Sequence, residues 1–356
     1  MATDPTAHRP PTIRTVAARA GVSKSLVSLV LQNSTRVSEE KRRAVLEAVA
    51  ELGYRPDPVA RSLAERRTRT IGVVIDDLSN PWYVELLDGL RPVLHEHGLR
   101  PLLADGRTEP NAVQALSDLR VDGLVLVGTP TASAVDQVNS LGRPIPTVVA
   151  GTREPLLPTV DVVANDDHRG GLLATTHLLE LGHRQIAHII GEREVGRLRR
   201  AGYEAAIANA GLDTVCTAGD WTVATGQRAG FELLRLPHRP TAIVAANDLS
   251  AVGVLAAADE LCLRVPEDLS VVGYDNSVFS RLHRLSLTTI DSHSAEVGRV
   301  AGRMLTARLD GDEGTAETRL LSPALIPRSS TGPAVEVAPN LTPTAGRSAA
   351  SSRSRR

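Results

Sequence analysis

The sequence predicts a small all-α head with a helix-turn-helix, followed by an α/β body of two subdomains, each built on a doubly wound parallel sheet. Three observations support this fold class. A chain of 356 residues is too long for one ordinary hydrophobic core. Three short helical patterns lie between Thr12 and Leu52. From Ile71 onward, apolar strand-like runs alternate with helical segments, as in parallel sheets covered on both faces.

Capping and turn residues place the three helices of the head. Thr12 can cap a helix over TIRTVAARA, which Gly21 ends, and Ser23 can cap a second helix over KSLVSLVLQ. Ser38 can cap a third helix with an apolar stripe. The stripe consists of Val45, Leu46, Val49 and Leu52. Two helices separated by a glycine turn are typical of a helix-turn-helix.

The second helix has an apolar face for packing and a polar face for DNA. Val27 and Val30 are expected to point inward, toward the small Ala17 where the two helices cross. At 100° per residue, four polar side chains fall within one arc of about 100°, which can face base edges in the major groove. They are Lys24, Ser25, Ser28 and Gln32. Leu29 lies about 40° beyond this arc, next to Ser25. A three-helix bundle without a ligand remains the alternative at this point.

Charge is distributed unevenly along the chain. Residues 1–70 contain 13 Lys and Arg against 7 Asp and Glu, a net charge of +6, so the remaining residues sum to −7 for a total of −1. A basic head on an acidic body indicates a polyanionic partner at one end, although a solvated charged surface fits the charge equally well. Residues 1–11 and 333–356 are predicted to be disordered tails.

The body is predicted to bind a ligand outside the carboxyl ends of its strands. Its strand-like runs are IGVVI, RPLLAD, GLVLVG, PTVVAG, VDVVAND, QIAHIIG, TAIVAAN and LSVVGYD. The chain has only eight aromatic residues, yet Trp82, Tyr83 and Trp221 follow strands or lie in loops facing the predicted cleft. Aromatic rings stack well on the C–H face of a sugar, although core packing is the alternative, above all for Tyr83. Pro92 is expected to kink or shorten its helix.

Longer segments resemble one known family in order along the chain. They are TIRTVAARAGVSKSLVSLVLQNSTRVSEEKRRAVLEAVAELGYRPDPVARSL, TIGVVIDDLSNPWY, VDGLVLV, HLLELGHRQIAHIIG, AIVAANDLSAVGVLAA, RVPEDLSVVGYDN and LTTI. The chain therefore resembles the LacI/GalR family of bacterial transcriptional repressors over about residues 12–332. The resemblance implies a DNA-binding domain at 12–56, a hinge helix and linker at 57–69 and a periplasmic-binding-protein-like effector and dimerisation domain at 70–332. The chain is expected to cross between the two subdomains near 162–166, 288–292 and 322–326.

The resemblance also implies a homodimer on a pseudo-palindromic operator, with Leu63 of the hinge helix entering the minor groove beside Ala60. Ser23 and Arg36 can position the head on phosphates. The expected DNA-contacting residues are Ser23, Lys24, Ser25, Ser28, Leu29, Gln32, Arg36, Ala60 and Leu63. Leu29 stands where the family usually has arginine, and Leu26 where it usually has threonine. The operator is therefore expected to differ from those of typical members, with Leu29 meeting a thymine methyl group or only packing.

Polar effector-binding residues are assigned by the resemblance. Arg199 matches the arginine with which the family binds its effectors. Asn247, Asp248 and Asp275 match polar residues of the family's cleft. Helix capping or hydrogen bonding within a turn is the alternative role for Asn247 and Asp275. The expected effector-binding residues are Trp82, Tyr83, Arg199, Trp221, Asn247, Asp248 and Asp275. Arg193 is a weaker candidate. Ala150 and Ser292 depart from the family's sugar-binding pattern, in which aspartate and a polar amide are common.

Enzymatic function is not expected. Both lysines, Lys24 and Lys41, lie in the head, so the body has no Walker lysine, and the chain has no GxSxG or HExxH motif. His177, His183 and His188 are expected to be structural or surface residues, and Cys216 and Cys262 buried small hydrophobes. No cofactor or metal is expected. Without a signal peptide or membrane span, the chain is predicted to be cytoplasmic, associated with the nucleoid when bound to DNA.

The sequence thus predicts a ligand-responsive, sequence-specific transcriptional repressor, controlling genes of carbohydrate uptake or catabolism through a sugar or sugar-derived effector. The rival classes are a solute-binding protein, which would need an export signal and no basic head, and an enzyme on a doubly wound fold, for which a catalytic constellation is missing.

Overall fold

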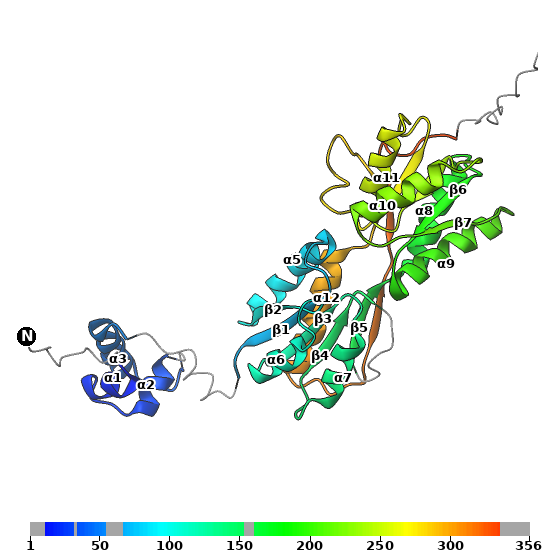
Figure 1. Cartoon of the computed structure of the whole chain (residues 1–356). Coiled ribbons are helices and arrows are strands. Elements are labelled where there is room, and N and C mark those ends of the chain that lie inside the picture. Colours follow the sequence, from blue (N-terminus) through cyan, green and yellow to red (C-terminus); the bar gives the residue numbers. More distant parts are fainter. Residues whose placement is uncertain (1–10, 32–33, 55–66, 153–159, 335–356) are drawn as a thin grey trace, which may run out of the picture. The chain divides into compact units, whose positions relative to one another are not determined.

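The computed structural model describes residues 11–31, 34–54, 67–152 and 160–334 (Figure 1). The chain divides into two compact units, Met1–Thr68 and Arg69–Arg356, which we call the head and the body and describe separately. Among the described residues, no helix is both long and apolar enough to cross a membrane.

The head contains three helices, α1 (Ile13–Arg19), α2 (Lys24–Leu31) and α3 (Glu39–Leu52). Thr12 caps α1 through a capping box with Thr15, and the hydroxyl of Ser23 accepts a hydrogen bond from the Leu26 amide at the start of α2 (3.3 Å). Gly21 makes the turn between the helices with a φ of 67°. The predicted caps and turn of the first two helices are therefore confirmed. Ser38 precedes α3 in extended conformation, but its side chain makes no capping hydrogen bond, contrary to the prediction.

The core of the head is formed by the residues that the helical periodicity predicts to point inward, with one exception. Val16, Val27 and Val45 are fully buried, and Ala17 and Val30 nearly so. The predicted stripe on α3 is wrong at Leu46, which is 50% exposed. A residue next to Val45 lies 100° away around the helix, so Leu46 leaves the buried face while Ala48 joins it.

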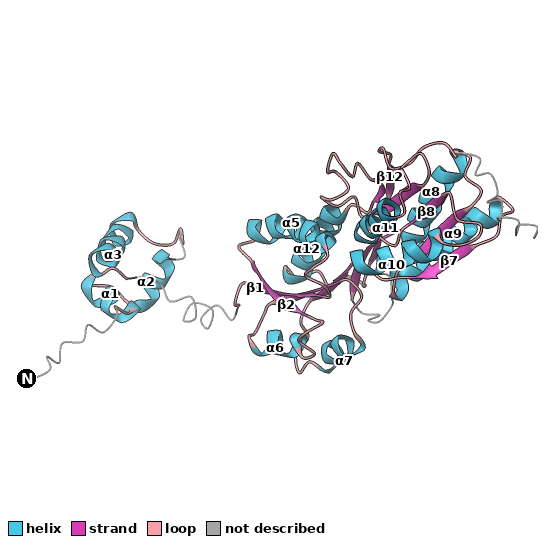
Figure 2. Cartoon of the chain, turned by 45° about the horizontal axis from the view of Figure 1, so that its top comes forward, coloured by secondary structure: helices cyan, strands magenta, loops and turns pink. Residues whose placement is uncertain are grey.

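The first subdomain of the body has a six-stranded sheet with all strands parallel. Its strands, in the spatial order β11-β5-β4-β3-β1-β2, are β1 (Thr70–Ile75), β2 (Arg100–Asp105), β3 (Gly123–Val127), β4 (Thr147–Ala150), β5 (Asp161–Asn165) and β11 (Thr318–Leu321). Two helices cover each face of the sheet (Figure 2). They are α5 (Pro81–Glu96) and α12 (Ser294–Leu309) on one face, and α6 (Ala112–Asp118) and α7 (Ala132–Ser140) on the other.

The second subdomain repeats this architecture with one antiparallel strand. Its strands, in the spatial order β12-β10-β9-β8-β6-β7, are β6 (Ile186–Ile190), β7 (Val215–Ala218), β8 (Ala242–Val244), β9 (Ser270–Tyr274), β10 (Thr288–Asp291) and β12 (Ala324–Ile326). Its helices are α8 (Asp167–Glu180), α9 (Arg193–Asn209), α10 (Val223–Leu234) and α11 (Asp248–Glu260). The antiparallel edge strand β12 departs from the predicted parallel sheet. An edge strand has one neighbour only, so a mixed sheet tolerates its reversal.

The chain crosses between the subdomains three times. It leaves the first sheet after β5, returns between β10 and α12, and leaves again between β11 and β12. Residues 333 and 334, expected to begin a disordered tail, are part of the body, since the Ala334 amide donates to the Leu181 carbonyl (2.9 Å). The rest of that tail, residues 335–356, and the predicted N-terminal tail, residues 1–11, lie almost wholly outside the described residues.

Two side-chain predictions for the body have different outcomes. The three histidines are structural: His188 is buried with its pKa lowered to about 4 by burial, His183 bonds Thr241 and Ser270, and His177 bonds Thr331. Cys262 is exposed rather than buried, because it lies in the turn that follows α11 with a φ of 55°.

The expectation that Pro92 shortens its helix is wrong, since α5 continues through Pro92 to Glu96. Packing outweighs the lost backbone hydrogen bond: Leu90 and Leu94 are fully buried against α12. The two helices cross at glycines. A Cβ on Gly89 would overlap the Ala295 carbonyl group, and one on Gly298 would overlap the Leu86 carbonyl group.

We therefore expect Gly89→Ala to lower the free energy of unfolding of the body by about 1–3 kcal/mol, because the added methyl group forces α5 and α12 apart. Chemical denaturation of the full chain measures the change. The matched control is Gly142→Ala, since a Cβ at Gly142 meets nothing within 4 Å. Equal stabilities of the two variants would contradict the close crossing.

Candidate functional site

The head presents part of the predicted polar face of α2 to solvent. Lys24 and Ser25 are exposed, Ser28 is half-buried, and Leu29 is 38% exposed beside them. Arg36 is also exposed, three residues before α3. Leu26 packs against the head core, so it lies on the opposite side of the helix from the polar face. The predicted contacts Gln32, Ala60 and Leu63, and most of the predicted hinge at 57–69, lie outside the described residues.

A cavity that is open to solvent lies in the body between the carboxyl ends of the two sheets. Its walls come from both subdomains: Asp76 follows β1, Asn165 ends β5, Glu192 follows β6, and Asp275 follows β9. The full lining is Asp76, Asn80, Trp82, Tyr83, Gly128, Thr129, Gly151, Asn165, Asp167, Glu192, Arg193, Val195, Arg199, Trp221 and Asp275. This is the position at which doubly wound folds bind their ligands.

Three of the chain's aromatic residues form walls of the cavity: Trp82, Tyr83 and Trp221. Each ring packs on a glycine that directly follows a strand. A Cβ on Gly151 would overlap the ring of Trp82, one on Gly128 would overlap Tyr83, and one on Gly191 would overlap Trp221. Trp82 and Tyr83 also belong to the core of the first subdomain and meet edge to face at 5.1 Å. Their positions are therefore held by packing before any ligand binds.

Arg199 is the most heavily bonded cation of the cavity wall. Its Nε donates to Oδ1 of Asp167 (2.9 Å), Nη1 donates to the Ala246 carbonyl (2.7 Å), and Nη2 lies 3.5 Å from Oδ1 of Asp275. Its guanidinium also lies 3.5 Å from the ring centroid of Tyr274. Only 7% of Arg199 is exposed. The guanidinium group therefore binds acceptors of the protein itself and also lines the cavity.

Burial shifts the ionisation of this cluster. It raises the pKa of Asp275 well above the usual range, although Arg199 opposes that shift. Burial alone would lower the pKa of Arg199, but the charges of Asp167 and Asp275 raise it overall. Burial also raises the pKa of Asp76. Asp275 has a φ of 108°, in a region that favours glycine, and such backbone strain is found at ligand sites.

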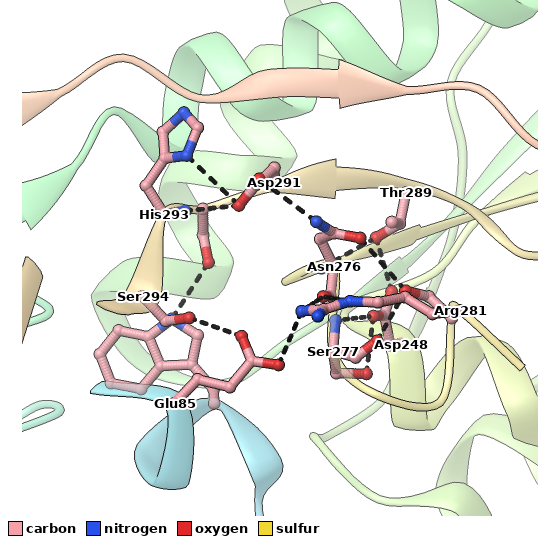
Figure 3. Close-up of polar contacts among 12 residues, drawn as sticks. Glu85, Asp248, Asn276, Ser277, Arg281, Thr289, Asp291, His293 and Ser294 are labelled. Carbon is pink, nitrogen blue, oxygen red and sulfur yellow. Dashed lines mark hydrogen bonds and ion pairs between the residues drawn. The ribbon is translucent and has the colours of Figure 1, made fainter. Parts of the chain in front are cut away.

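Two of the predicted effector residues lie away from the cavity lining. Oδ1 of Asn247 caps α11 by accepting from the Ser250 amide (2.8 Å). Asp248 accepts from the backbone and hydroxyl of Ser277 (2.7 and 2.8 Å) and from the hydroxyl of Thr289 (2.6 Å; Figure 3). Burial raises the pKa of Asp248 to about 6. Asp248 therefore holds the loop after β9, which carries Asp275, whereas Nδ2 of Asn247 donates to the Trp221 carbonyl (3.2 Å).

Polar contacts join the two subdomains at two places. At the cavity, Nη1 of Arg193 donates to the Thr129 carbonyl (2.7 Å) and lies 3.4 Å from Oδ2 of Asp76. Outside the cavity lining, Glu85 of α5 accepts from Nη2 of Arg281 (3.0 Å; Figure 3). Within the first subdomain, Glu85 also accepts from the hydroxyl of Ser294 (2.9 Å).

Ser292 and Ala150, the two departures from the family pattern, have different surroundings. The hydroxyl of Ser292 lies at a subdomain crossing and accepts from Nε1 of Trp82 (3.1 Å). It therefore orients an aromatic wall of the cavity. Ala150 is fully buried at the end of β4 and supplies no polar group.

Several cavity residues were missed by sequence reasoning, chiefly Asp76, Asn165, Asp167 and Glu192. All four lie at or within two residues of a strand's carboxyl end, so the rule that ligands bind there would have identified them. Within the described residues, no group of His, Cys, Asp and Glu has an arrangement that could hold a metal ion.

A helix-turn-helix head on a cleft-bearing α/β body defines a class of DNA-binding proteins with a small-molecule site. Comparison with known proteins agrees. Residues 12–57 match the bacterial regulatory proteins of the lacI family, and residues 175–331 match the periplasmic binding protein-like domain.

Individual relatives match nearly the whole chain. The HTH-type transcriptional repressor PurR of Erwinia tasmaniensis is 35% identical over 328 residues, covering 90% of this chain and 96% of that protein. The lac repressor dimer bound to operator and the anti-inducer ONPF matches with a TM-score of 0.82 at 28% identity, covering 91% of this chain and all of that one. The regulator CelR in complex with cellobiose matches with a TM-score of 0.68 at 32% identity, covering 90% and 99%.

The chain belongs to the LacI family and is a transcriptional repressor, not an enzyme.

Proposed function

We propose that this repressor responds to a sugar or sugar derivative bound in the body cavity and controls genes of carbohydrate uptake or catabolism. The observation that carries the proposal is the cavity wall itself. Trp82, Tyr83 and Trp221 offer ring faces, and Asp275 and Arg199 offer an acceptor and a donor at the same cavity. Flat apolar faces with a few convergent polar groups match the C–H face and the hydroxyl groups of a sugar ring. The CelR relative holds cellobiose.

The proposed mechanism couples effector binding to DNA binding through the closure of the subdomains. Both subdomains contribute to the cavity, so a ligand that contacts both favours one closure angle. The cross-subdomain contacts of Arg193 and Glu85 would re-form or break as that angle changes. The hinge at 57–69, with Ala60 and Leu63 at the minor groove, is proposed to carry the change to the operator. By linkage, operator binding alters effector affinity by the same factor.

We infer that the working unit is a homodimer. Exposed apolar side chains gather on the first turn of α5 and on the loop after β9: Val84 is 54%, Val278 54%, Phe279 36% and Leu282 48% exposed. The ion pair of Glu85 with Arg281 brings these two segments together. Large exposed apolar surfaces mark protein interfaces, and a two-fold dimer suits a pseudo-palindromic operator.

Specific DNA binding is tested by an electrophoretic mobility shift with the full chain and DNA selected from a randomised library. We expect saturable, salt-sensitive binding, and we expect Leu29→Arg to change the selected sequence, because arginine reads guanine edges that leucine cannot bond. The head should remain folded, since Leu29 is 38% exposed. Unchanged base preference would show that Leu29 only packs, and a lack of any selected sequence would overturn the operator proposal.

For the effector site, we expect Asp275→Asn to weaken ligand binding at least tenfold while leaving operator affinity unchanged. The substitution keeps the side-chain shape but removes the charge that faces Arg199 and the cavity. Calorimetry with sugars that raise the unfolding temperature measures the loss. The matched control is Asp259→Asn, a change of the same kind on α11 outside the cavity lining. Equal ligand affinity in both variants would contradict the site.

For the dimer, we expect Phe279→Asp to produce monomers in sedimentation velocity and to weaken operator binding more than tenfold, because a charge cannot be buried unpaired in an apolar interface. Leu119→Asp is the control, since Leu119 is 62% exposed at the C-cap of α6, which covers the opposite face of the sheet from α5. Dissociation by neither variant would argue against this face.

A further inference from the structure

We propose that the effector is an unphosphorylated, non-acidic sugar. The cavity is lined by more carboxylates than guanidinium groups, and its buried arginine already binds carboxylates of the protein. The inference rests on the proposed function, and it narrows the effector from any sugar derivative to one without an anionic group.

The charges around the cavity favour a ligand that donates hydrogen bonds. Four carboxylates line it, those of Asp76, Asp167, Glu192 and Asp275, against the two guanidinium groups of Arg193 and Arg199. An anionic ligand would bring a further negative charge into a partly buried site, where unpaired like charges are costly. A hydroxyl group brings a donor and no charge.

Arg199, the buried arginine, is not free to bind an anion as a bidentate partner. Arg199 faces Asp167, Asp275 and the Ala246 carbonyl through its three nitrogens, and one face of its plane lies on Tyr274. A phosphate or carboxylate would have to displace these partners and leave a buried carboxylate unpaired. Arg193 is engaged with Asp76 and the Thr129 carbonyl.

Asn165 supplies an independent sign of a missing donor. The residue is 4% exposed, lines the cavity, and its Oδ1 has no hydrogen-bond donor among the described residues. A buried acceptor without a partner is destabilising, so a ligand that donates a hydrogen bond to it recovers the lost free energy. A sugar hydroxyl or amine can donate to Asn165, whereas a phosphate dianion or carboxylate can only accept.

The surroundings of Asp275 raise its pKa. Burial raises it, and the nearby carboxylates of Asp248 and Asp167 add to the shift. Hydroxyl groups that donate to Asp275 favour its ionised form.

The test is calorimetry on the full chain with matched pairs of probes: glucose and glucose 6-phosphate, ribose and ribose 5-phosphate, cellobiose and cellobionic acid. We expect the neutral member of at least one pair to bind, and its anionic partner to bind at least tenfold more weakly. An anionic member that binds as tightly as its neutral partner, or more tightly, overturns the inference and leaves the proposed sugar response standing. If no member of any pair binds, the sugar response itself is overturned for these probes and the inference falls with it.

Two variants connect the preference to the residues. Asp167→Asn keeps an acceptor for Nε of Arg199 but removes one negative charge. We therefore expect the ratio of the affinities for the neutral and the anionic probe to fall at least tenfold. The control is Glu194→Gln, which neutralises a carboxylate on α9 that pairs with Arg197 outside the cavity lining. Equal discrimination in these two variants would contradict the role of Asp167.

Should Asp167→Asn fail to fold, Asn165→Leu tests the same proposal. This change keeps the branching pattern of the side chain but removes the unpaired acceptor. The neutral probe is therefore expected to bind about tenfold more weakly, while the unfolding temperature of the ligand-free protein holds or rises. Undiminished affinity for the neutral probe would show that Asn165 receives no hydrogen bond from the ligand.

Discussion

The buried guanidinium of Arg199 connects the elements on which the ligand cavity depends. It comes from α9 and binds the first residue of α8 through Asp167, the end of β8 through the Ala246 carbonyl, and the end of β9 through Asp275. Desolvating a charge costs several kcal/mol, which opposite charges and good geometry must offset. Two carboxylates and an aromatic face provide that compensation. The positions of these acceptors are therefore coupled, and a ligand that perturbs one of them perturbs the others.

The positions of the aromatic rings in the cavity wall depend on a different constraint, which is that glycines without side chains lie next to them. Gly128, Gly151 and Gly191 directly follow strands, and each leaves the space that a ring of the cavity wall occupies. The rings are thus placed by packing against backbone, and a ligand does not have to order them. Because part of this packing belongs to the core of the first subdomain, the ligand surface and the stability of that subdomain share residues.

The second subdomain reaches the first through a small number of polar contacts. Glu85 of the first subdomain receives a hydrogen bond from Arg281 of the second, and Trp82 donates to Ser292 at a chain crossing. The pair of Glu85 with Arg281 is partly exposed, so it contributes little to stability by itself. Weak, replaceable contacts between two rigid sheets are what a change of closure angle requires.

Much of the fold was predictable from local patterns. Thr12, Gly21 and Ser23 set the ends of helices through their own backbone bonding, and apolar runs identified the strands of two covered sheets, because both signals are local. The position of Leu46 and the shortening of the helix at Pro92 were predicted wrongly, and the antiparallel β12 was not predicted. Their outcomes depend on neighbours distant in sequence: which face α3 turns to the other helices, how tightly α12 packs on α5, and where a returning strand finds a free edge.

The sequence by itself determined the class of the protein and, in its cavity, the three aromatic walls together with Arg199 and Asp275, since strand ends and family motifs are visible in linear order. Only the tertiary structure decided which polar groups face the cavity. Asn247 and Asp248 satisfy the backbone and the loop after β9, whereas Asn165, Asp167 and Asp76 line the cavity. The physical reason is that a polar side chain forms hydrogen bonds with the partner that lies within about 3 Å of it. Packing between segments far apart in the chain decides which partner lies at that distance.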